Sequence, residues 1–352
     1  MFSYSPVLQI IGTVYLIFVF GIVLGKTHFI KLKDLRSVWQ MVKMIGFPSL
    51  LFFNIAKMSF NLDNLKLFLV VFVVQFSVHI LIFMVSRISK KSDRFSKYIS
   101  YTLIFGFNEY VLQFGPIVRF INPQLSIIPI MSLIGNNFIF IPFFKYLSIR
   151  KSNDSSSEGE LSNEQESPQV EPTGNPEIGE DHEKEEEDLS DIGNDENDQC
   201  IGIFYKLLIT PSNCMTLIGV IWNLIGIPIP NFVSKMLIDY ERIVFPSGLI
   251  ACSLELSNYS DSNMLSVFIV ICFHYIVLPI IMLLWTYVFS LSAITRQLCV
   301  LMCVSPVSLL GLQLSARFPI DHTKIRAAFF WTNVLYLPFA MIWVIILIEI
   351  IN

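Results

Sequence analysis

The amino-acid sequence predicts an all-α integral membrane protein, with ten transmembrane helices arranged as two inverted five-helix repeats. Three observations lead to this prediction. The chain of 352 residues is 54% hydrophobic, with a mean hydropathy of +0.62. Apolar stretches of about twenty residues recur along it, the length at which a helix crosses a bilayer. Short motifs of the first half also recur in the second half at nearly one offset.

The recurring motifs indicate a duplicated unit. Phe-Pro-Ser at 47–49 recurs at 245–247, an offset of 198 residues. His79 recurs as His274, an offset of 195. The stretch 137–142, from Asn to Pro, recurs at 333–338, an offset of 196. Each match is weak alone, but three in the same order favour a duplication. A unit with an odd number of spans must insert its second copy upside down, which is typical of secondary transporters.

The predicted spans follow the apolar stretches in order. They lie near residues 5–25, 35–58, 65–87, 96–120 and 124–149, then 211–229, 236–257, 264–288, 293–317 and 323–350. This gives a first repeat over 1–149, a loop over 150–200 and a second repeat over 201–352.

The loop differs sharply in composition from the two repeats. Residues 151–199 hold 18 of the 28 acidic residues and two basic ones, which leaves 22 basic and 10 acidic residues elsewhere, a net charge of +12. Such a charged, weakly apolar segment cannot bury enough apolar area to offset the entropy of ordering, so we predict disorder. Lys and Arg gather in the connections after spans one, three and nine and beside the loop. The loop and these connections are therefore predicted to be cytosolic, with both termini on the opposite side.

Prolines inside the spans mark the predicted site. A proline breaks helical hydrogen bonding, which lipid cannot satisfy, so a break must be packed in protein or line a cavity. Pro116 and Pro306 fall in the fourth span of each repeat, with polar neighbours that include Asn108, Ser305 and Gln313. We predict that both prolines open their helices, and that the two breaks cross and expose backbone groups to a solute.

Other polar residues in the spans have two readings each. Glu109 is either a coupling carboxylate in the substrate site or a structural partner of a basic residue such as Arg119. His79 and His274 could relay protons, although hydrogen bonding within the bundle is favoured. Asn136, Asn137 and Asn333 either join helices or contact the solute.

Around these residues the chain resembles the auxin efflux carrier family, with its PIN-formed and PIN-likes members. That family carries an Asn shortly before the first crossover proline, as in Asn-Thr-Gly-Phe-Leu-Gly-Leu-Pro. The stretch from Asn108 to Pro116 is one residue longer, and Glu109 takes the Asn position if the prolines are aligned. Residues 326–333 (Arg-Ala-Ala-Phe-Phe-Trp-Thr-Asn) also look like the family. The resemblance implies proline crossovers in helices four and nine. It also implies a scaffold of helices one, two, six and seven, against which the other six move like an elevator.

The function predicted is a secondary carrier for a small organic anion, in the endoplasmic reticulum or the plasma membrane. Its substrate site would hold Asn108, Glu109, Pro116, Asn137, Ser305, Pro306, Gln313 and Asn333. No Walker A, HExxH or GxSxG sequence is present, so we expect neither an ATP-driven pump nor an enzyme. No cofactor, metal or nucleic acid is expected. Membrane lipid is expected to surround the protein, and the possibility of a homodimer is left open. The alternatives are a carrier like the bile-acid sodium symporters, and a non-transporting receptor or scaffold.

Overall fold

The computed structural model describes residues 4–27, 29, 32–58, 61–88, 94–106, 108, 110–121, 125, 127–140, 209–256, 264–315, 320 and 322–351. Residue contacts group Met1–Ile139 with Thr210–Asn352 in one compact unit, and Phe140–Ile209 forms a second. The predicted acidic loop, 150–200, lies outside the described residues. In the described ranges, every secondary-structure element is a helix apart from one isolated β-bridge, which confirms the all-α prediction.

The described helices lie within or close to the apolar stretches of the sequence. In the first half they are α1 (Tyr4–Lys26), α2 (Leu32–Met41), η1 (Val42–Gly46), α3 (Phe47–Ala56), α4 (Leu62–Arg87), α5 (Arg94–Phe105), η3 (Tyr110–Phe114), α6 (Gly115–Ile121), α7 (Ile127–Gly135) and η5 (Asn136–Phe140), where η marks a π-helical turn. In the second half they are α10 (Pro211–Ile225), α11 (Asn231–Leu256), α12 (Met264–Cys272), η6 (Phe273–Val277), α13 (Leu278–Val288), α14 (Ala293–Cys303), α15 (Leu309–Ser315) and α16 (His322–Ile351).

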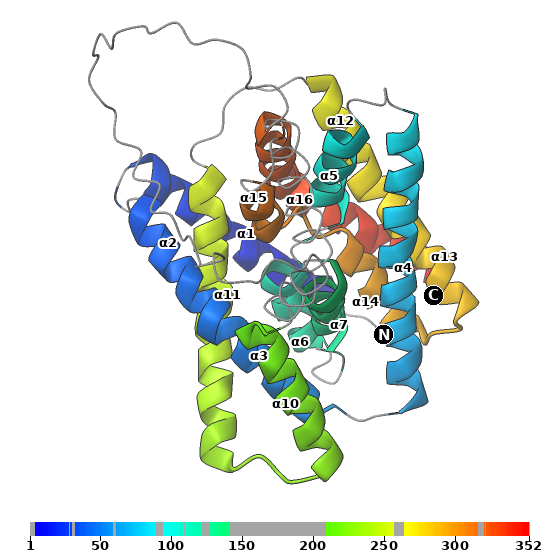
Figure 1. The fold of residues 1–352 in the computed structure, drawn as a ribbon. Coiled ribbons are helices and arrows are strands. Elements are labelled where there is room, and N and C mark those ends of the chain that lie inside the picture. Colours follow the sequence, from blue (N-terminus) through cyan, green and yellow to red (C-terminus); the bar gives the residue numbers. More distant parts are fainter. Residues whose placement is uncertain are drawn as a thin grey trace, which may run out of the picture. The chain divides into compact units, whose positions relative to one another are not determined.

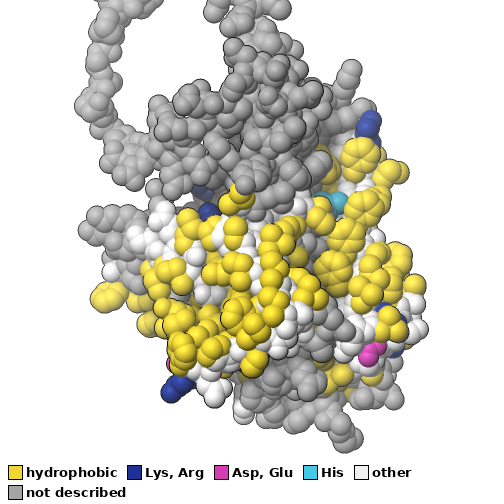
Figure 2. Space-filling model, turned by 60° about the horizontal axis from the view of Figure 1, so that its bottom comes forward, with side chains coloured by type: hydrophobic (Ala, Val, Ile, Leu, Met, Phe, Trp, Pro, Cys, Tyr) yellow, Lys and Arg dark blue, Asp and Glu magenta, His cyan; other side chains and the backbone are white. Residues whose placement is uncertain are grey.

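Five of the described helical segments are long and apolar enough to cross a membrane. These are Gln9–Lys26, Ser37–Ala56, Leu62–Arg87, Val267–Val288 and His322–Glu349. The segments Ile127–Ile139, Pro211–Ile225 and Ala293–Cys303 are apolar but shorter. Figure 2 shows one face of the protein, on which most described side chains are hydrophobic and few are charged. An apolar surface of this extent suits a lipid environment.

Prolines explain where the π-helical turns occur. Pro48, Pro116 and Pro279 each lie two residues after the end of a π-turn, at the second residue of the α-helix that follows. A proline has no N–H to donate and its ring clashes with the carbonyl four residues earlier. A wider turn before the proline relieves this clash and lets the helix continue.

Local capping residues set several helix starts and stops. The Asn61 side chain accepts from Asn64 N at 2.8 Å and begins α4, and Thr210 accepts from Asn213 N at the start of α10. Gly226 ends α10 with a φ of 74°, in the left-handed region that glycine adopts without strain.

Helix packing falls into two groups within the larger unit. The first group joins α1, α2, α3, α10 and α11, with α10 lying along α3 and α11 along α1 and α2 (Figure 1). The second group joins α4, α5, α7 and α12 to α16, together with η3, which packs on α7 and α14 and continues into α6. Two glycines let α11 and the η3–α6 segment approach closely. A Cβ on Gly248 would lie 2.6 Å from Leu112, and one on Gly115 would lie 2.9 Å from Phe245.

Candidate functional site

Two helix interruptions meet in the described structure. The first separates α5, which ends at Phe105, from η3, and the second separates α14, which ends at Cys303, from α15. Asn108 and Val307 pair as an antiparallel β-bridge across the two interruptions. Segments about two hundred residues apart in the chain therefore meet through their backbones, as the sequence predicts for the two stretches around Asn108 and Ser305. We call this meeting point the crossing.

The two prolines do not play matching roles, which corrects one prediction. Pro306 lies in the second interruption, and its side chain is buried. Pro116 instead lies inside α6, where the preceding turn η3 keeps the helix continuous. The first interruption comes about eight residues earlier, around Asn108, so Pro116 does not open its helix. The relief of the proline clash by a π-turn explains the difference.

The backbone of the second interruption is held by residues from two other helices. His274 Nε2 hydrogen-bonds to the carbonyl oxygen of Ser305. On the other side of Pro306, the N–H of Val307 donates to Thr332 Oγ1 at 3.2 Å. Tyr275 donates its hydroxyl to the carbonyl of Thr332. The break is thus braced from η6 and from α16.

The Ser305 hydroxyl has no hydrogen-bond partner among the described residues. Ser305 is fully buried, and no described group donates to its Oγ or accepts from it. Leaving a buried hydroxyl unpaired costs about 1–3 kcal/mol. Such a group at a helix interruption is suited to contact a bound solute or water.

The first interruption is tightly packed. Asn108 is 5% exposed, and Gly106 N donates to the carbonyl of Thr102 at 2.8 Å. A Cβ on Gly106 would lie 2.9 Å from Cε1 of His79, so the histidine ring from α4 packs directly against this interruption. Glu109 lies outside the described residues, so its two readings stay predictions.

Asn333 makes its hydrogen bonds within the protein. Its Oδ1 accepts from Gln113 Nε2 at 2.6 Å, and its Nδ2 donates to the carbonyl of Phe329 at 2.7 Å. Asn333 follows Thr332 directly on α16, so one short stretch of α16 touches both the second interruption and the η3 turn that follows the first. This arrangement favours the reading of Asn333 as a residue that joins helices.

The structure places Asn137 in another environment. It belongs to η5, and its carbonyl accepts from Asn213 Nδ2 of α10 at 3.5 Å. Its neighbour Asn136 accepts from Gln75 Nε2 at 3.3 Å, and the same amide donates to Ser132 Oγ at 2.7 Å. None of these contacts reaches the crossing.

The remaining predicted residue, Gln313, belongs to α15, which begins directly after the second interruption. Its side chain lies outside the description, and its role stays a prediction.

Three residues at the crossing were absent from the predicted site: Gln113, His274 and Thr332. Gln113 lies in the polar stretch before Pro116 and could have been included on that basis. His274 recurs as a counterpart of His79, which was a signal of a shared role. Thr332 lies in the stretch 326–333 that resembles the family, but a threonine in an apolar helix is common and nothing in that stretch singles it out.

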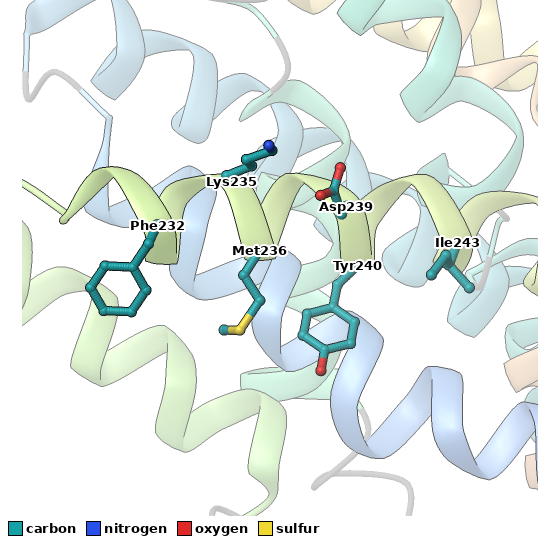
Figure 3. Close-up of a pocket in the computed structure, with 6 residues that line it drawn as sticks. All are labelled: Phe232, Lys235, Met236, Asp239, Tyr240 and Ile243. Carbon is teal, nitrogen blue, oxygen red and sulfur yellow. The ribbon is translucent and has the colours of Figure 1, made fainter.

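A surface depression of about 390 Å³ lies elsewhere. Its described lining residues all belong to α11: Phe232, Lys235, Met236, Asp239, Tyr240 and Ile243. Figure 3 shows Phe232, Met236 and Tyr240 projecting from one side of the helix. Asp239 pairs with Arg242 at 3.2 Å on this exposed stretch. Because no residue of the crossing lines it, this depression is not the candidate site.

The described residues contain no group of three or more His, Cys, Asp or Glu side chains that could hold a metal ion. The polar groups at the crossing are instead amides, hydroxyls, an imidazole and backbone groups. These groups can bind a polar solute through hydrogen bonds.

Comparison with known proteins identifies the family. A family model described as membrane transport protein matches residues 6–344, almost the whole chain. No curated protein matches the chain. The family match agrees with the apolar helical segments and the paired helix interruptions. The chain therefore belongs to the membrane transport protein family, the family of auxin efflux carriers and PIN-like proteins.

Proposed function

We propose that this membrane transport protein is a secondary carrier that binds a small organic anion at the crossing and moves it by an elevator-type mechanism. In this proposal ten helices span the membrane as two inverted five-helix repeats, and the segment 150–200 lies on the cytosolic side. The membrane is that of the endoplasmic reticulum or the cell surface.

The observation that carries the proposal is the crossing itself. Asn108 and Val307 pair through their backbones where two apolar helices are interrupted, and the buried Ser305 Oγ beside them has no partner in the part of the chain that the structure describes. Irregular backbone at membrane depth is tolerated where it is buried in protein or lines a solute pathway. An unpaired hydroxyl next to it supports the second role.

The position of the bridge also supports the inverted repeat. The two paired residues are 199 positions apart, close to the offsets of 195, 196 and 198 of the recurring motifs. A symmetric pair of crossovers brings equivalent positions of the two repeats together. The bridge therefore joins residues that are nearly equivalent in the predicted duplication.

The division of the helices into two packing groups supports the elevator movement. The first group, α1, α2, α3, α10 and α11, corresponds to the scaffold that the family resemblance implies. The second group contains both interruptions. The two groups meet partly at two glycines. The Phe245 side chain packs against Gly115, and the Leu112 side chain packs against Gly248. Small residues let helices approach closely without polar bonds that would resist sliding.

The chemistry of the crossing suits an anion that carries an apolar body. Hydroxyl, amide and imidazole groups can donate to a carboxylate, and the bundle around them is apolar. A small carboxylic acid such as indole-3-acetate has both parts and serves as a first probe.

The test is uptake by purified protein reconstituted in vesicles, with labelled indole-3-acetate, benzoate, acetate and glutamate. We expect saturable uptake of at least one apolar monocarboxylate, which Ser305→Ala lowers about tenfold. The same variant should keep or raise the melting temperature, since it removes a hydroxyl that had no partner. The matched control is Ser132→Ala, because Ser132 is equally buried but accepts a hydrogen bond from Gln75. It should lower the melting temperature and leave uptake nearly unchanged.

Uptake no greater than that of empty vesicles for every anion would contradict the carrier proposal and favour a receptor or scaffold. Uptake that requires sodium would favour the alternative resembling the bile-acid symporters. Normal uptake by Ser305→Ala would reject the crossing as the binding site.

A further inference from the structure

The π-helical turn η6 contacts both interruptions through three consecutive side chains. The Phe273 ring lies 4.3 Å, centroid to centroid, from Phe105, the last residue before the first interruption. His274 Nε2 bonds the carbonyl of Ser305. Tyr275 reaches the same break through Thr332, whose Oγ1 accepts from the N–H that follows Pro306. One turn of helix thus touches the first interruption and one side of the second, and it reaches the other side of the second through Thr332.

The sequence explains why a π-turn stands at this place. Pro279 lies four residues after Tyr275, and it has no N–H to donate to the Tyr275 carbonyl. That carbonyl instead accepts from the indole Nε1 of Trp343 at 2.7 Å. The Tyr275 ring also stacks on Phe339, with centroids 4.4 Å apart and planes 1° from parallel. The proline, the indole and the stacked ring together fix the orientation of this turn.

The equivalent histidine of the first half is held differently. His79 lies in the uninterrupted helix α4 and packs its ring against Gly106 at the first interruption. Each interruption therefore has a histidine from the helix beside it. In the described residues, the histidine beside the second interruption lies in a π-turn, next to a tyrosine that bonds the Thr332 carbonyl.

We propose that His274 and Tyr275 are positioning residues, which hold the backbone around Pro306 in the register that lets Val307 pair with Asn108. They act on the solute through the shape of the crossing. This inference rests on the proposed function only for the claim that the crossing is a substrate site. The register of the Asn108–Val307 pairing can be measured without any solute.

The register can be measured by cross-linking. Residues paired in an antiparallel bridge have Cα atoms about 4.5–5.5 Å apart, which is within the range that a disulfide spans. Oxidation of the double variant Asn108→Cys, Val307→Cys should therefore form a disulfide, which mass spectrometry of the joined peptides distinguishes from the six native cysteines. His274→Phe and Tyr275→Phe, each added to this double variant, should lower the yield at least about threefold, since each deletes one brace.

Two controls separate positioning from a general loss of structure. His274→Gln keeps a donor amide near the place of Nε2 and should restore most of the cross-link yield, and of anion uptake in the background without added cysteines. Thr216→Val removes a buried hydroxyl that donates within α10, to the Ser212 carbonyl at 2.8 Å, and should leave the yield unchanged.

Parental yields in both His274→Phe and Tyr275→Phe would overturn the proposal. A yield in His274→Gln as low as that in His274→Phe would also overturn it, because the ring and not the hydrogen bond would then matter. If His274→Phe does not fold, Tyr275→Phe decides, since it removes a single oxygen. A normal cross-linking pattern with no uptake of any anion would reject the proposed function and leave the positioning role standing.

Discussion

Gln113 and Asn333 join the two halves of the chain through a buried hydrogen bond of 2.6 Å between Nε2 and Oδ1. Gln113 belongs to η3, after the first interruption, and Asn333 follows the residue of α16 that braces the second. The bond thus joins the segment after the first interruption to the helix that braces the second, across 220 positions of sequence.

Removing one partner of this hydrogen bond should lower the stability of the folded protein. In Gln113→Leu, Asn333 Oδ1 stays buried without its donor, and we expect a loss of about 1–3 kcal/mol in the free energy of unfolding. The double variant Gln113→Leu, Asn333→Leu should lose less than the sum of the single variants, because neither partner is then left unpaired. Thermal unfolding in detergent measures this. Additive losses would show that the two amides do not act as a pair.

The two prolines should respond differently to replacement. Pro306→Ala should weaken anion uptake about tenfold or more, because an alanine N–H lets α14 and α15 approach a continuous helix. Pro116→Ala should change uptake less than about twofold, since α6 is already continuous there. Both variants are compared by initial uptake rates at equal protein. Equal effects of the two changes would contradict the assignment of the first interruption to Asn108.

Glycines of α1 provide a matched pair for helix packing. A Cβ on Gly21 would lie 1.7 Å from Ser253 Oγ of α11, whereas one on Gly12 would meet nothing within 4 Å. Gly21→Ala should therefore lose about 1–3 kcal/mol of stability through overpacking. Gly12→Ala should gain about 0.5–1 kcal/mol, because glycine is a poor helix former. Melting temperatures compare the two, and a destabilised Gly12→Ala would remove the packing explanation.

Glu109 follows Asn108 directly in the sequence. If its carboxylate takes part in coupling, Glu109→Gln should abolish the pH dependence of uptake and keep anion binding. A structural ion pair would instead make this variant less stable with its pH dependence intact. Uptake from pH 5 to 8, together with the melting temperature, separates the two readings. A variant unchanged in both would exclude Glu109 from the mechanism.

The acidic segment should be dispensable for the membrane part. Its composition predicts little buried area, so deletion of residues 155–195 should leave insertion and basal uptake nearly intact. Membrane fractionation and initial rates test this. Failure to insert would contradict the prediction, and a changed rate with normal insertion would indicate regulation.

The sequence was sufficient to predict the helical segments and the two stretches that meet, because apolar length and recurring motifs carry that information. It was insufficient to locate the first interruption. Both Pro116 and Pro306 have polar neighbours, and only the geometry of η3 shows that the helix passes through Pro116. Thr332 and the acceptor role of Asn333 depend on contacts between distant helices, which no local pattern encodes.

The backbone bridge between Asn108 and Val307 has a consequence for biogenesis. A ribosome finishes the first interruption about two hundred residues before it makes the segment that pairs with it. During that interval the irregular backbone around Asn108 has no partner from the second half, and we expect the first half to need protection by the insertion machinery or by chaperones. Two separately expressed fragments, 1–149 and 201–352, should then assemble only when both are present, since each lacks half of the crossing.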